Sequence, residues 1–371
     1  MIYLDNASTT KPSAEAIEAA EAAFEAFGNP SSLHRMGMDA EKLVKDARQA
    51  VASVLDVSGK NIYFTSGGTE ANNTAILGYV QGNRKRGNHI VTTKIEHPSV
   101  LEPFRYLERL GVDVTYVGVK KNGEISLDEF EAALREDTIL VSVMAVNNET
   151  GTVQHVERLK EIMKEKSQKA VLHSDCVQAF CKIPIYPQKT GIDMLSLSSH
   201  KIHGLKGAGA LYAGDGINIK PIVFGGGQER NLRSGTENTA GIAAFGAAVK
   251  SFKRVDPDKR AELAEKILKN IPDSFVNGSG ENSGYILNVS FPGIRSEILL
   301  HSLESRGIFV STGSACSSNN PHPSYVLDAM KVDRKAIDGA IRFSFCEEDF
   351  DADFVAEVLR EEVLKIRKYV R

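Results

Sequence analysis

The sequence predicts an α/β protein, with a mainly parallel sheet in a large domain and a smaller α+β domain beside it. Two observations carry this prediction. Strand and helix patterns alternate over most of the chain, and the strands are almost continuously apolar. Such strands are typical of parallel sheets that helices cover on both faces. The length of 371 residues suits one large or two unequal domains.

The large domain is predicted from short apolar strands and the helices between them. The first helix, over 14–27, is rich in Ala and Glu and stops at Gly28, a residue type that commonly follows a helix end. Further elements are expected as strands at 62–65, 89–91, 112–117, 139–146, 171–173 and 194–197 and as helices at 69–80, 99–110, 127–134 and 156–166. This alternation is typical of βαβ units.

The pattern changes near 250–260, where Asp256-Pro257-Asp258 separates two helical runs. The elements expected around and after this point are helices at 240–253, up to 271, at 296–305 and from 350 onward, and strands at 285–291 and 340–345. We therefore predict a large domain over 13–255 and a small domain formed by 1–12 and 256–371.

Charge and composition exclude several classes of protein. The 45 Lys and Arg against 48 Asp and Glu leave a net charge of −3, so the basic excess of a nucleic-acid-binding protein is missing. The longest apolar run, 240–249, is about half the ~20 residues of a membrane span, and the N-terminus has no secretory pattern. The four Cys include no Cys-x-x-Cys pair. We expect a soluble cytoplasmic enzyme without membrane or direct nucleic-acid partners.

One turn combines two glycines with a helix start. The segment Thr65-Ser66-Gly67-Gly68-Thr69-Glu70 follows an expected strand and opens an expected helix. Glycines let backbone amides approach a ligand, and a helix N-terminus favours an anion. Gly68 and Thr69 are therefore candidate phosphate-binding residues. The alternative is a plain tight turn in which Thr69 caps the helix.

Polar residues follow two further expected strands. Asp175 and Gln178 come just after the strand that ends at His173, and His97 ends another strand. Open α/β sheets bind ligands at the carboxyl ends of their strands. A buried carboxylate there needs a cationic partner, because desolvation would otherwise neutralise it. The structural alternatives are a helix cap for Asp175 and an ordinary packed or solvated imidazole for His97.

The segment Ser198-Ser199-His200-Lys201 follows the strand expected at 194–197. A lysine at a strand end is costly unless it is exposed, paired or used covalently, and an activated amine forms Schiff bases with carbonyl groups. Ser198 and His200 are able to hydrogen-bond phosphate oxygens. His200 and His203 also suggest a metal site, but no third ligand stands at metal spacing, so we expect no metal.

A polar, glycine-bearing stretch at 311–318 contains Cys316. Free cysteines are more often buried as small apolar residues, but these hydrophilic surroundings favour an accessible, reactive thiol. Cys176, Cys181 and Cys346 lie in or beside apolar patterns and are interpreted as packing residues. The segment 312–324, rich in Ser, Asn and Pro, is predicted to be a mobile loop.

Together these segments resemble a known family. The resemblance rests on Tyr3-Leu4-Asp5-Asn6-Ala7-Ser8-Thr9-Thr10, Asn29-Pro30-Ser31-Ser32-Leu33-His34, the Gly-Gly-Thr-Glu turn, Ser-Ser-His-Lys, and Gly313-Ser314-Ala315-Cys316. The chain is similar over practically its whole length to cysteine desulfurases of the NifS/IscS type. These are class V aminotransferases, which are fold-type I pyridoxal-phosphate enzymes. The resemblance implies a large domain with a seven-stranded type of sheet and pyridoxal 5'-phosphate as cofactor.

The resemblance also implies roles at the cofactor ring. It makes Lys201 the Schiff-base lysine and His97 the imidazole stacked on the ring. Asp175 pairs with the pyridinium nitrogen, and Gln178 bonds the phenolic oxygen. The residues implied to hold the phosphate are Gly68, Thr69, Ser198 and His200, together with Thr236 of the neighbouring subunit. That last role implies a homodimer with shared sites.

For the substrate, the resemblance implies that Asn148 lies by the cofactor and, with Arg342, binds the carboxylate of L-cysteine. Cys316 takes the sulfur as a persulfide, and L-alanine is released. The sulfur then passes to an acceptor protein, such as an iron–sulfur scaffold or a tRNA-thiolation enzyme. The sequence departs from many relatives at Ser199, where they carry Gly, and at Leu205, where they carry Pro. Cys176 also places a second thiol beside Asp175 in the sequence.

Two other classes of function stay open at this point. One is a different pyridoxal-phosphate reaction, such as that of a selenocysteine lyase or an amino-acid:glyoxylate aminotransferase. The Gly-Ser-Ala-Cys stretch argues against a transaminase, which has no use for that thiol. The other is a non-catalytic scaffold with the same fold, against which the intact Lys201 and Asp175 argue.

Overall fold

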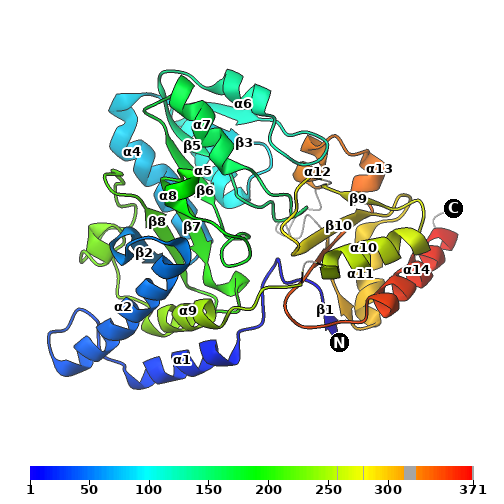
Figure 1. Ribbon diagram of the computed structural model, residues 1–371, viewed down its shortest axis with the longest axis horizontal. Coiled ribbons are helices and arrows are strands. Elements are labelled where there is room, and N and C mark those ends of the chain that lie inside the picture. Colours follow the sequence, from blue (N-terminus) through cyan, green and yellow to red (C-terminus); the bar gives the residue numbers. More distant parts are fainter. Residues whose placement is uncertain (257, 279, 313–322, 370–371) are drawn as a thin grey trace.

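The computed structural model describes residues 1–256, 258–278, 280–312 and 323–369, and its centre is a mixed sheet (Figure 1). In the described residues this sheet has the order β2-β8-β7-β6-β5-β3-β4. The strands are β2 (Ile62–Thr65), β3 (His89–Thr93), β4 (Asp113–Val117), β5 (Thr138–Ser142), β6 (Val171–Asp175), β7 (Met194–Ser198) and β8 (Gly209–Ala213). Strands β4, β3, β5, β6 and β7 run parallel, and β8 is antiparallel to both of its neighbours. The expected mainly parallel sheet is confirmed.

Helices cover both faces of this sheet. Ala210 and Tyr212 of β8 pack into the core on one face, and Leu211 and Ala213 pack into the core on the other. The first core includes residues of α2 (Arg35–Leu55), α6 (Leu127–Ala133), α7 (Val156–Lys166) and α9 (Thr239–Ser251). The second is built by α3 (Gly68–Asn73), a π-helical segment (Thr74–Gly78), α4 (Tyr79–Asn83) and α5 (Pro98–Arg109).

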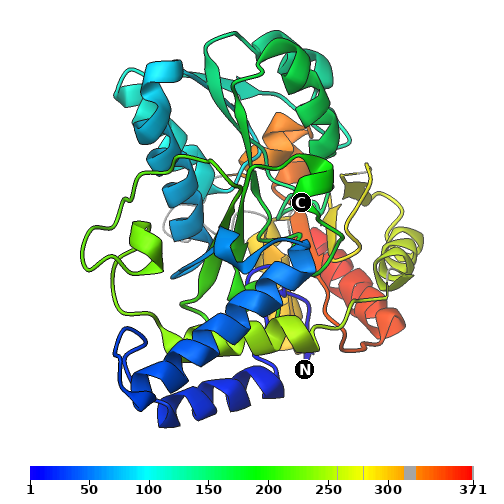
Figure 2. The same cartoon turned by 60° about the vertical axis from the view of Figure 1, so that its left-hand side comes forward.

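The longest helix, α2, and the antiparallel strand β8 were not predicted. Helix α2 buries mainly Ala and Val among many charged residues, so few large apolar side chains mark it in the sequence. Both views place α2 beside α9, with α1 (Ala14–Glu25) alongside (Figure 1, Figure 2). The packing is close, because a Cβ on Gly246 of α9 would stand 2.6 Å from the Cα of Ala47.

A second, antiparallel sheet lies in the C-terminal part, with the order β12-β13-β10-β9. Its strands are β9 (Phe275–Asn277), β10 (Ile286–Ser290), β12 (Ser311–Thr312) and β13 (Ala340–Ser344), and the accompanying helices are α10 (Asp258–Asn270), α11 (Ser296–Ser305) and α14 (Ala352–Tyr369). Leu263, Leu299 and Val355 of these helices belong to one apolar core with the sheet. Strand β1 (Ile2–Tyr3) pairs with β11 (Ile308–Phe309), so the N-terminus runs with this part of the chain.

The residues near the expected domain limits lie where the two apolar cores meet. Leu4 and Val255 belong to the core of the C-terminal part, and Phe252 packs against this core and against that of the large sheet. The domain limits at 13–255, 1–12 and 256–371 stay a prediction. Within the described ranges, no helix combines the length and the apolar character that crossing a bilayer needs.

Candidate active site

Most of the residues that the sequence singles out surround one cavity of about 350 Å³. It lies where β6 and β7 end, as expected for an α/β sheet. The predicted site residues that line it are Gly68, Thr69, His97, Asn148, Asp175, Gln178, Ser198, His200, Lys201 and Arg342. Thr236 is exposed and is not among the residues that line the cavity. Cys316 lies outside the described residues.

Lys201 ends a short 3-10 turn that directly follows β7. Its ammonium Nζ donates to the backbone carbonyls of Ala7 and Ser8, each at 2.6 Å. The N-terminal segment is held there by the backbone, since Thr10 N–H donates to the carbonyl of His200 at 2.9 Å. The segment that follows β1 therefore forms one wall of the cavity and receives the lysine amine.

Asp175 ends β6 and is held by two hydrogen-bond donors. Its Oδ1 accepts from Val177 N–H at 3.0 Å, and its Oδ2 accepts from the Asn72 amide at 2.8 Å. The side chain is only 6% exposed. Both partners donate, and each carboxylate oxygen has room to accept a further hydrogen bond. Asp175 is therefore equipped to face a cationic ring nitrogen in the cavity.

The two histidines of the cavity are kept neutral. Burial lowers the pKa of His97, the Lys201 amine lowers it further, and the Asp175 charge partly opposes this. Burial and Lys201 likewise lower the pKa of His200 to about 4. His200 Nδ1 shares a hydrogen bond of 3.2 Å with Thr9 Oγ1. Near neutral pH both imidazoles are uncharged, which suits ring stacking by one and hydrogen bonding by the other.

Sequence reasoning missed Lys182, which sets the orientation of Gln178. Lys182 Nζ donates to Gln178 Oε1 at 3.0 Å, and Gln178 Nε2 donates to the Ala7 carbonyl at 2.9 Å. The lysine is 7% exposed, and burial lowers its pKa to about 7, with Lys201 acting in the same direction. Its place four residues after Gln178 was the available signal, but a lone lysine in an apolar stretch carries little information.

Gly68 lets the turn after β2 approach the strand end at β6. A Cβ on Gly68 would stand 2.6 Å from Val177 Cγ2, so only glycine fits without a shift. Glu70 holds the same turn in place. Its Oε2 accepts from Ser66 N–H at 2.8 Å, and its Oε1 accepts from Arg233 at 2.7 Å. The turn therefore forms a fixed, glycine-lined wall of the cavity.

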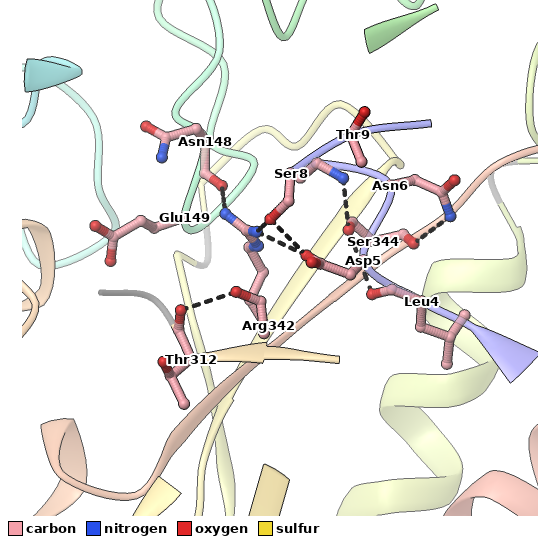
Figure 3. Close-up of polar contacts among 12 residues, drawn as sticks. Leu4, Asp5, Asn6, Ser8, Thr9, Asn148, Glu149, Thr312, Arg342 and Ser344 are labelled. Atoms are coloured by element: carbon pink, nitrogen blue, oxygen red, sulfur yellow. Dashed lines mark hydrogen bonds and ion pairs between the residues drawn. The ribbon is translucent and has the colours of Figure 1, made fainter. Parts of the chain in front are cut away.

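Arg342 reaches the cavity from β13 (Figure 3). Its Nη1 donates to the Asn148 carbonyl at 2.9 Å, and its Nη2 donates to Asp5 Oδ1 at 2.9 Å and to Ser8 Oγ at 2.7 Å. Arg342 Nε and Asn148 Oδ1 are buried and have no partner in the described residues. Buried polar atoms are normally paired. These two leave a donor and an acceptor for a polar ligand.

Two buried carboxyl groups beside the cavity were also missed. Burial raises the pKa of Glu96 to about 8 and that of Glu149 to about 7. Glu149 Oε2 accepts from Ser324 Oγ at 2.5 Å. Both residues adjoin predicted ones, His97 and Asn148, but sequence alone gives no sign of their burial.

Three cysteines fall within the described residues, and all are poor nucleophiles where they lie. Burial raises the pKa of Cys176 and of Cys181 to about 12, and it also raises the pKa of half-buried Cys346. Cys176 has no exposed surface and belongs to the core, and it is not among the residues that line the cavity. Its position next to Asp175 in the sequence therefore does not make it a second thiol of the site.

A family model described as aminotransferase class V matches residues 2–353, and the chain belongs to this family. Among its relatives, the cysteine desulfurase IscS of Dictyoglomus turgidum is 40% identical over 378 residues, which cover 99% of this chain and 95% of the relative. A NifS-like protein of known structure has a TM-score of 0.87 and 37% identity and covers 100% of this chain and 99% of its own. SspA in complex with cysteine has a TM-score of 0.85 and 33% identity, over 94% of this chain and 100% of its own.

Enzymes of this family use pyridoxal 5'-phosphate, and the cavity fits that cofactor. Asp175 is held as an acceptor for the ring nitrogen, and Lys201 offers an amine. The Gly68 turn leaves room that a Cβ would fill, beside the hydroxyl of Ser198. The unpaired Arg342 Nε and Asn148 Oδ1 provide further polar capacity.

Proposed function

We propose that this protein is a pyridoxal-phosphate-dependent cysteine desulfurase, which removes sulfur from L-cysteine and releases L-alanine. The observation that carries the proposal is one cavity lined both by the amine of Lys201 and by the carboxylate of Asp175. The relative named cysteine desulfurase IscS and the structural neighbour that binds cysteine support the reaction.

The bound cofactor would be held by groups already in place. Lys201 would bond its carbonyl carbon, Asp175 its ring nitrogen and Gln178 its phenolic oxygen, with His97 over the ring. The phosphate would lie against Gly68, Thr69, Ser198 and His200, which share the cavity wall. The bound cofactor supplies an electron sink that acidifies the α-hydrogen of an amino acid and weakens the bond from Cβ to sulfur.

Residues of the chain would move the substrate proton and hold the groups that contact the cofactor. The Lys201 amine would take the proton from the substrate Cα, because a lysine amine is a base when uncharged. Asp175 would accept from the ring nitrogen, and Val177 and Asn72 hold its side chain in place by donating to it. Lys182 holds the Gln178 carbonyl, which leaves the remaining amide hydrogen of Gln178 for the cofactor.

Arg342 and Asn148 would hold the substrate carboxylate. Three of the five N–H groups of Arg342 already bind Asn148, Asp5 and Ser8, so its plane is fixed before substrate arrives. The Nε–H and the second hydrogen on Nη1 remain for a ligand. A prearranged guanidinium recognises a carboxylate with little further ordering.

Cys316 would act as the sulfur acceptor. Its thiolate attacks the sulfur of the substrate: a bond between the two sulfur atoms forms, the bond from sulfur to Cβ breaks, and its electron pair stays with the carbon skeleton, which gains a proton and leaves as L-alanine. The persulfide on Cys316 would then pass to an iron–sulfur scaffold or a tRNA-thiolation enzyme. We place this reaction in the cytoplasm, where thiols stay reduced.

Mass spectrometry after addition of L-cysteine tests this function. We expect one added sulfur on the peptide that contains Cys316, with L-alanine released. Cys316→Ala should keep the visible absorbance of the lysine-linked cofactor but carry no added sulfur, and Lys201→Ala should lose both the absorbance and alanine release. Cys176→Ala is the matched control, because its buried thiol should leave the persulfide unchanged. Alanine release by Lys201→Ala would refute the assignment.

We also propose a homodimer in which Thr236 reaches the phosphate of the partner. Large apolar side chains are exposed on α1, between α1 and α2, and near residue 224, among them Phe27 at 76%, Leu33 at 97% and Phe224 at 77%. Exposed apolar side chains of this size are typical of surfaces that another chain covers.

A further inference from the structure

A row of hydrogen bonds joins His97 to Asp175 through Ser99 and Asn72. His97 Nδ1 lies 2.8 Å from Ser99 Oγ, and Ser99 Oγ accepts from Asn72 Nδ2 at 2.8 Å. The same Asn72 nitrogen donates to Asp175 Oδ2 at 2.8 Å. Asn72 is 1% exposed and Ser99 is 8% exposed, so water does not compete for these bonds. The row connects His97, which is proposed to lie over the cofactor ring, with Asp175, which is proposed to bind the ring nitrogen.

The direction of each bond follows from the donors. The backbone N–H of Ser99 donates to His97 Nδ1 at 3.1 Å, so Nδ1 is an acceptor and carries no hydrogen. Asn72 uses both amide hydrogens, one for Asp175 and one for Ser99 Oγ. Reversing the amide would turn its oxygen toward the Asp175 carboxylate, which disfavours that orientation. The Ser99 hydroxyl hydrogen therefore remains for His97 Nδ1.

Local structure holds these residues in register. His97 is the N-cap of α5, Pro98 is the first residue of that helix, and Ser99 follows. Asn72 lies near the end of α3, next to the π-helical segment 74–78. Single π turns inside helices are frequent at functional sites. Asn72 Oδ1 is buried and has no partner among the described residues, and an unpaired buried acceptor costs stability.

We propose that Asn72 and Ser99 are positioning residues that hold His97 as the tautomer with its hydrogen on Nε2 and tie its ring to Asp175. This inference rests on the proposed function. His97 Nδ1 already accepts from the hydroxyl and the backbone N–H of Ser99. Neutral His97 can therefore interact with a ligand only by donating the hydrogen on Nε2. It therefore acts on a bound ligand as a hydrogen-bond donor, and in this state it is not a base. Asp175 and Lys201 are the charged groups that act on its ring.

Nitrogen-15 NMR of the histidine rings in the full-length, cofactor-loaded protein, without cysteine, tests this assignment. His97→Gln identifies the His97 signals. We expect the wild type to show hydrogen on Nε2 and an unprotonated Nδ1. Asn72→Ala should move the Nδ1 signal, and it should raise the dissociation constant for pyridoxal phosphate roughly 10-fold, as expected when a charged group loses one hydrogen bond.

The Ser99 hydroxyl provides the decisive comparison. In a Ser99→Ala background the same Asn72→Ala change should move the His97 signals much less, because the connecting group is gone and only the charge of Asp175 still acts on the ring. Asn73→Ala is the matched control, since Asn73 donates to the Thr69 and Ser99 carbonyls and to neither end of the row. Hydrogen on Nδ1 in the wild type, or an equal effect of Asn72→Ala with and without the hydroxyl, would overturn the proposal. Because no cysteine is present, the readout separates this assignment from the desulfurase activity.

Discussion

Glu96 illustrates how a single side chain next to the site is held without water. It has no exposed surface, and its carboxyl group accepts from Thr93 Oγ1 at 2.6 Å and from the N–H of Met144 at 3.0 and 3.1 Å. Burial raises the pKa of Glu96 to about 8 despite these donors, and the charge of Asp175 adds to the rise. The group is therefore mostly protonated in the folded protein at neutral pH.

Glu96→Gln should make stability less dependent on pH. Between the unfolded pKa of 4.5 and the folded pKa of about 8, the folded wild type binds a proton that the unfolded chain has lost. Its stability must therefore fall as pH rises through this window. Each unit of pKa difference corresponds to about 1.4 kcal/mol, so the expected fall is a few kcal/mol. Glutamine cannot ionise and should lose this contribution.

The measurement is the free energy of unfolding in urea of both proteins at pH 5 and pH 8. The difference between variant and wild type should grow in favour of the variant at pH 8. Glu149, whose pKa is also raised, titrates in both proteins and cancels in this difference. An identical pH dependence in the two proteins would show that Glu96 is ionised when folded.

At the scale of single residues, the sequence predicted the side chains that line the cavity but not the side chains that hold them in position. His97, Asp175 and Lys201 follow strands, and parallel strand ends meet at one edge, so their meeting was predictable. Lys182 and Asn72 gave no such signal, because their role depends on which side chain lies opposite. That information exists only once the chain is folded.

At the scale of elements, a largely buried ion pair connects α2 to the 3-10 turn at 229–231. Arg48 donates from Nη1 and Nη2 to the two carboxylate oxygens of Glu229, at 2.8 and 2.7 Å. The side chains are 14% and 2% exposed. Glu229 also accepts from the N–H of Phe64, and the guanidinium lies 4.7 Å from that ring. One contact therefore joins α2, β2 and the turn.

Arg48→Met should destabilise the protein by about 3–5 kcal/mol, because it leaves the Glu229 carboxylate buried without its cation. Urea unfolding monitored by circular dichroism measures this. The double variant Arg48→Met/Glu229→Met removes both charges and should recover much of the loss. A loss below about 1 kcal/mol in the single variant would mean that water reaches Glu229.

Helix α2 also shows why some elements escaped prediction. Its buried stripe includes Ala40, Val44, Ala47 and Val51, so it contains few of the large apolar residues that mark a helix in the sequence. Strand β8 consists of Gly209-Ala210-Leu211-Tyr212-Ala213, which has little β-branched character. Both elements are stabilised by neighbours distant in the sequence, such as α9 and β2, rather than by local preference.

At the scale of the whole molecule, the proposed homodimer is the main prediction. We expect light scattering to give twice the mass of one chain. Leu33→Glu should shift the protein toward a single chain, because a charge buried among apolar side chains is costly. Leu364→Glu is the matched control, since Leu364 is 49% exposed and belongs to α14, a helix that lies away from α1 and α2 (Figure 1). A wild type that weighs one chain would contradict the proposal.

The order of elements predicted the fold class but not how the ends of the chain meet. Alternating strands and helices indicated the parallel sheet, and the change near 250–260 indicated a second unit. The pairing of β1 with β11 joins residues far apart in sequence, and two-residue strands carry no recognisable pattern.

This pairing has a consequence for how the protein matures. The ribosome makes Ala7 and Ser8 some 300 residues before strands β11 and β13, yet the pairing with these strands holds them against Lys201 and Arg342. A nascent chain that stops before β13 has its lysine but lacks the strand that sets the opposite wall. Translation must therefore pass β13 before the catalytic pocket can close, so fragments that end before β13 should be inert rather than partly active.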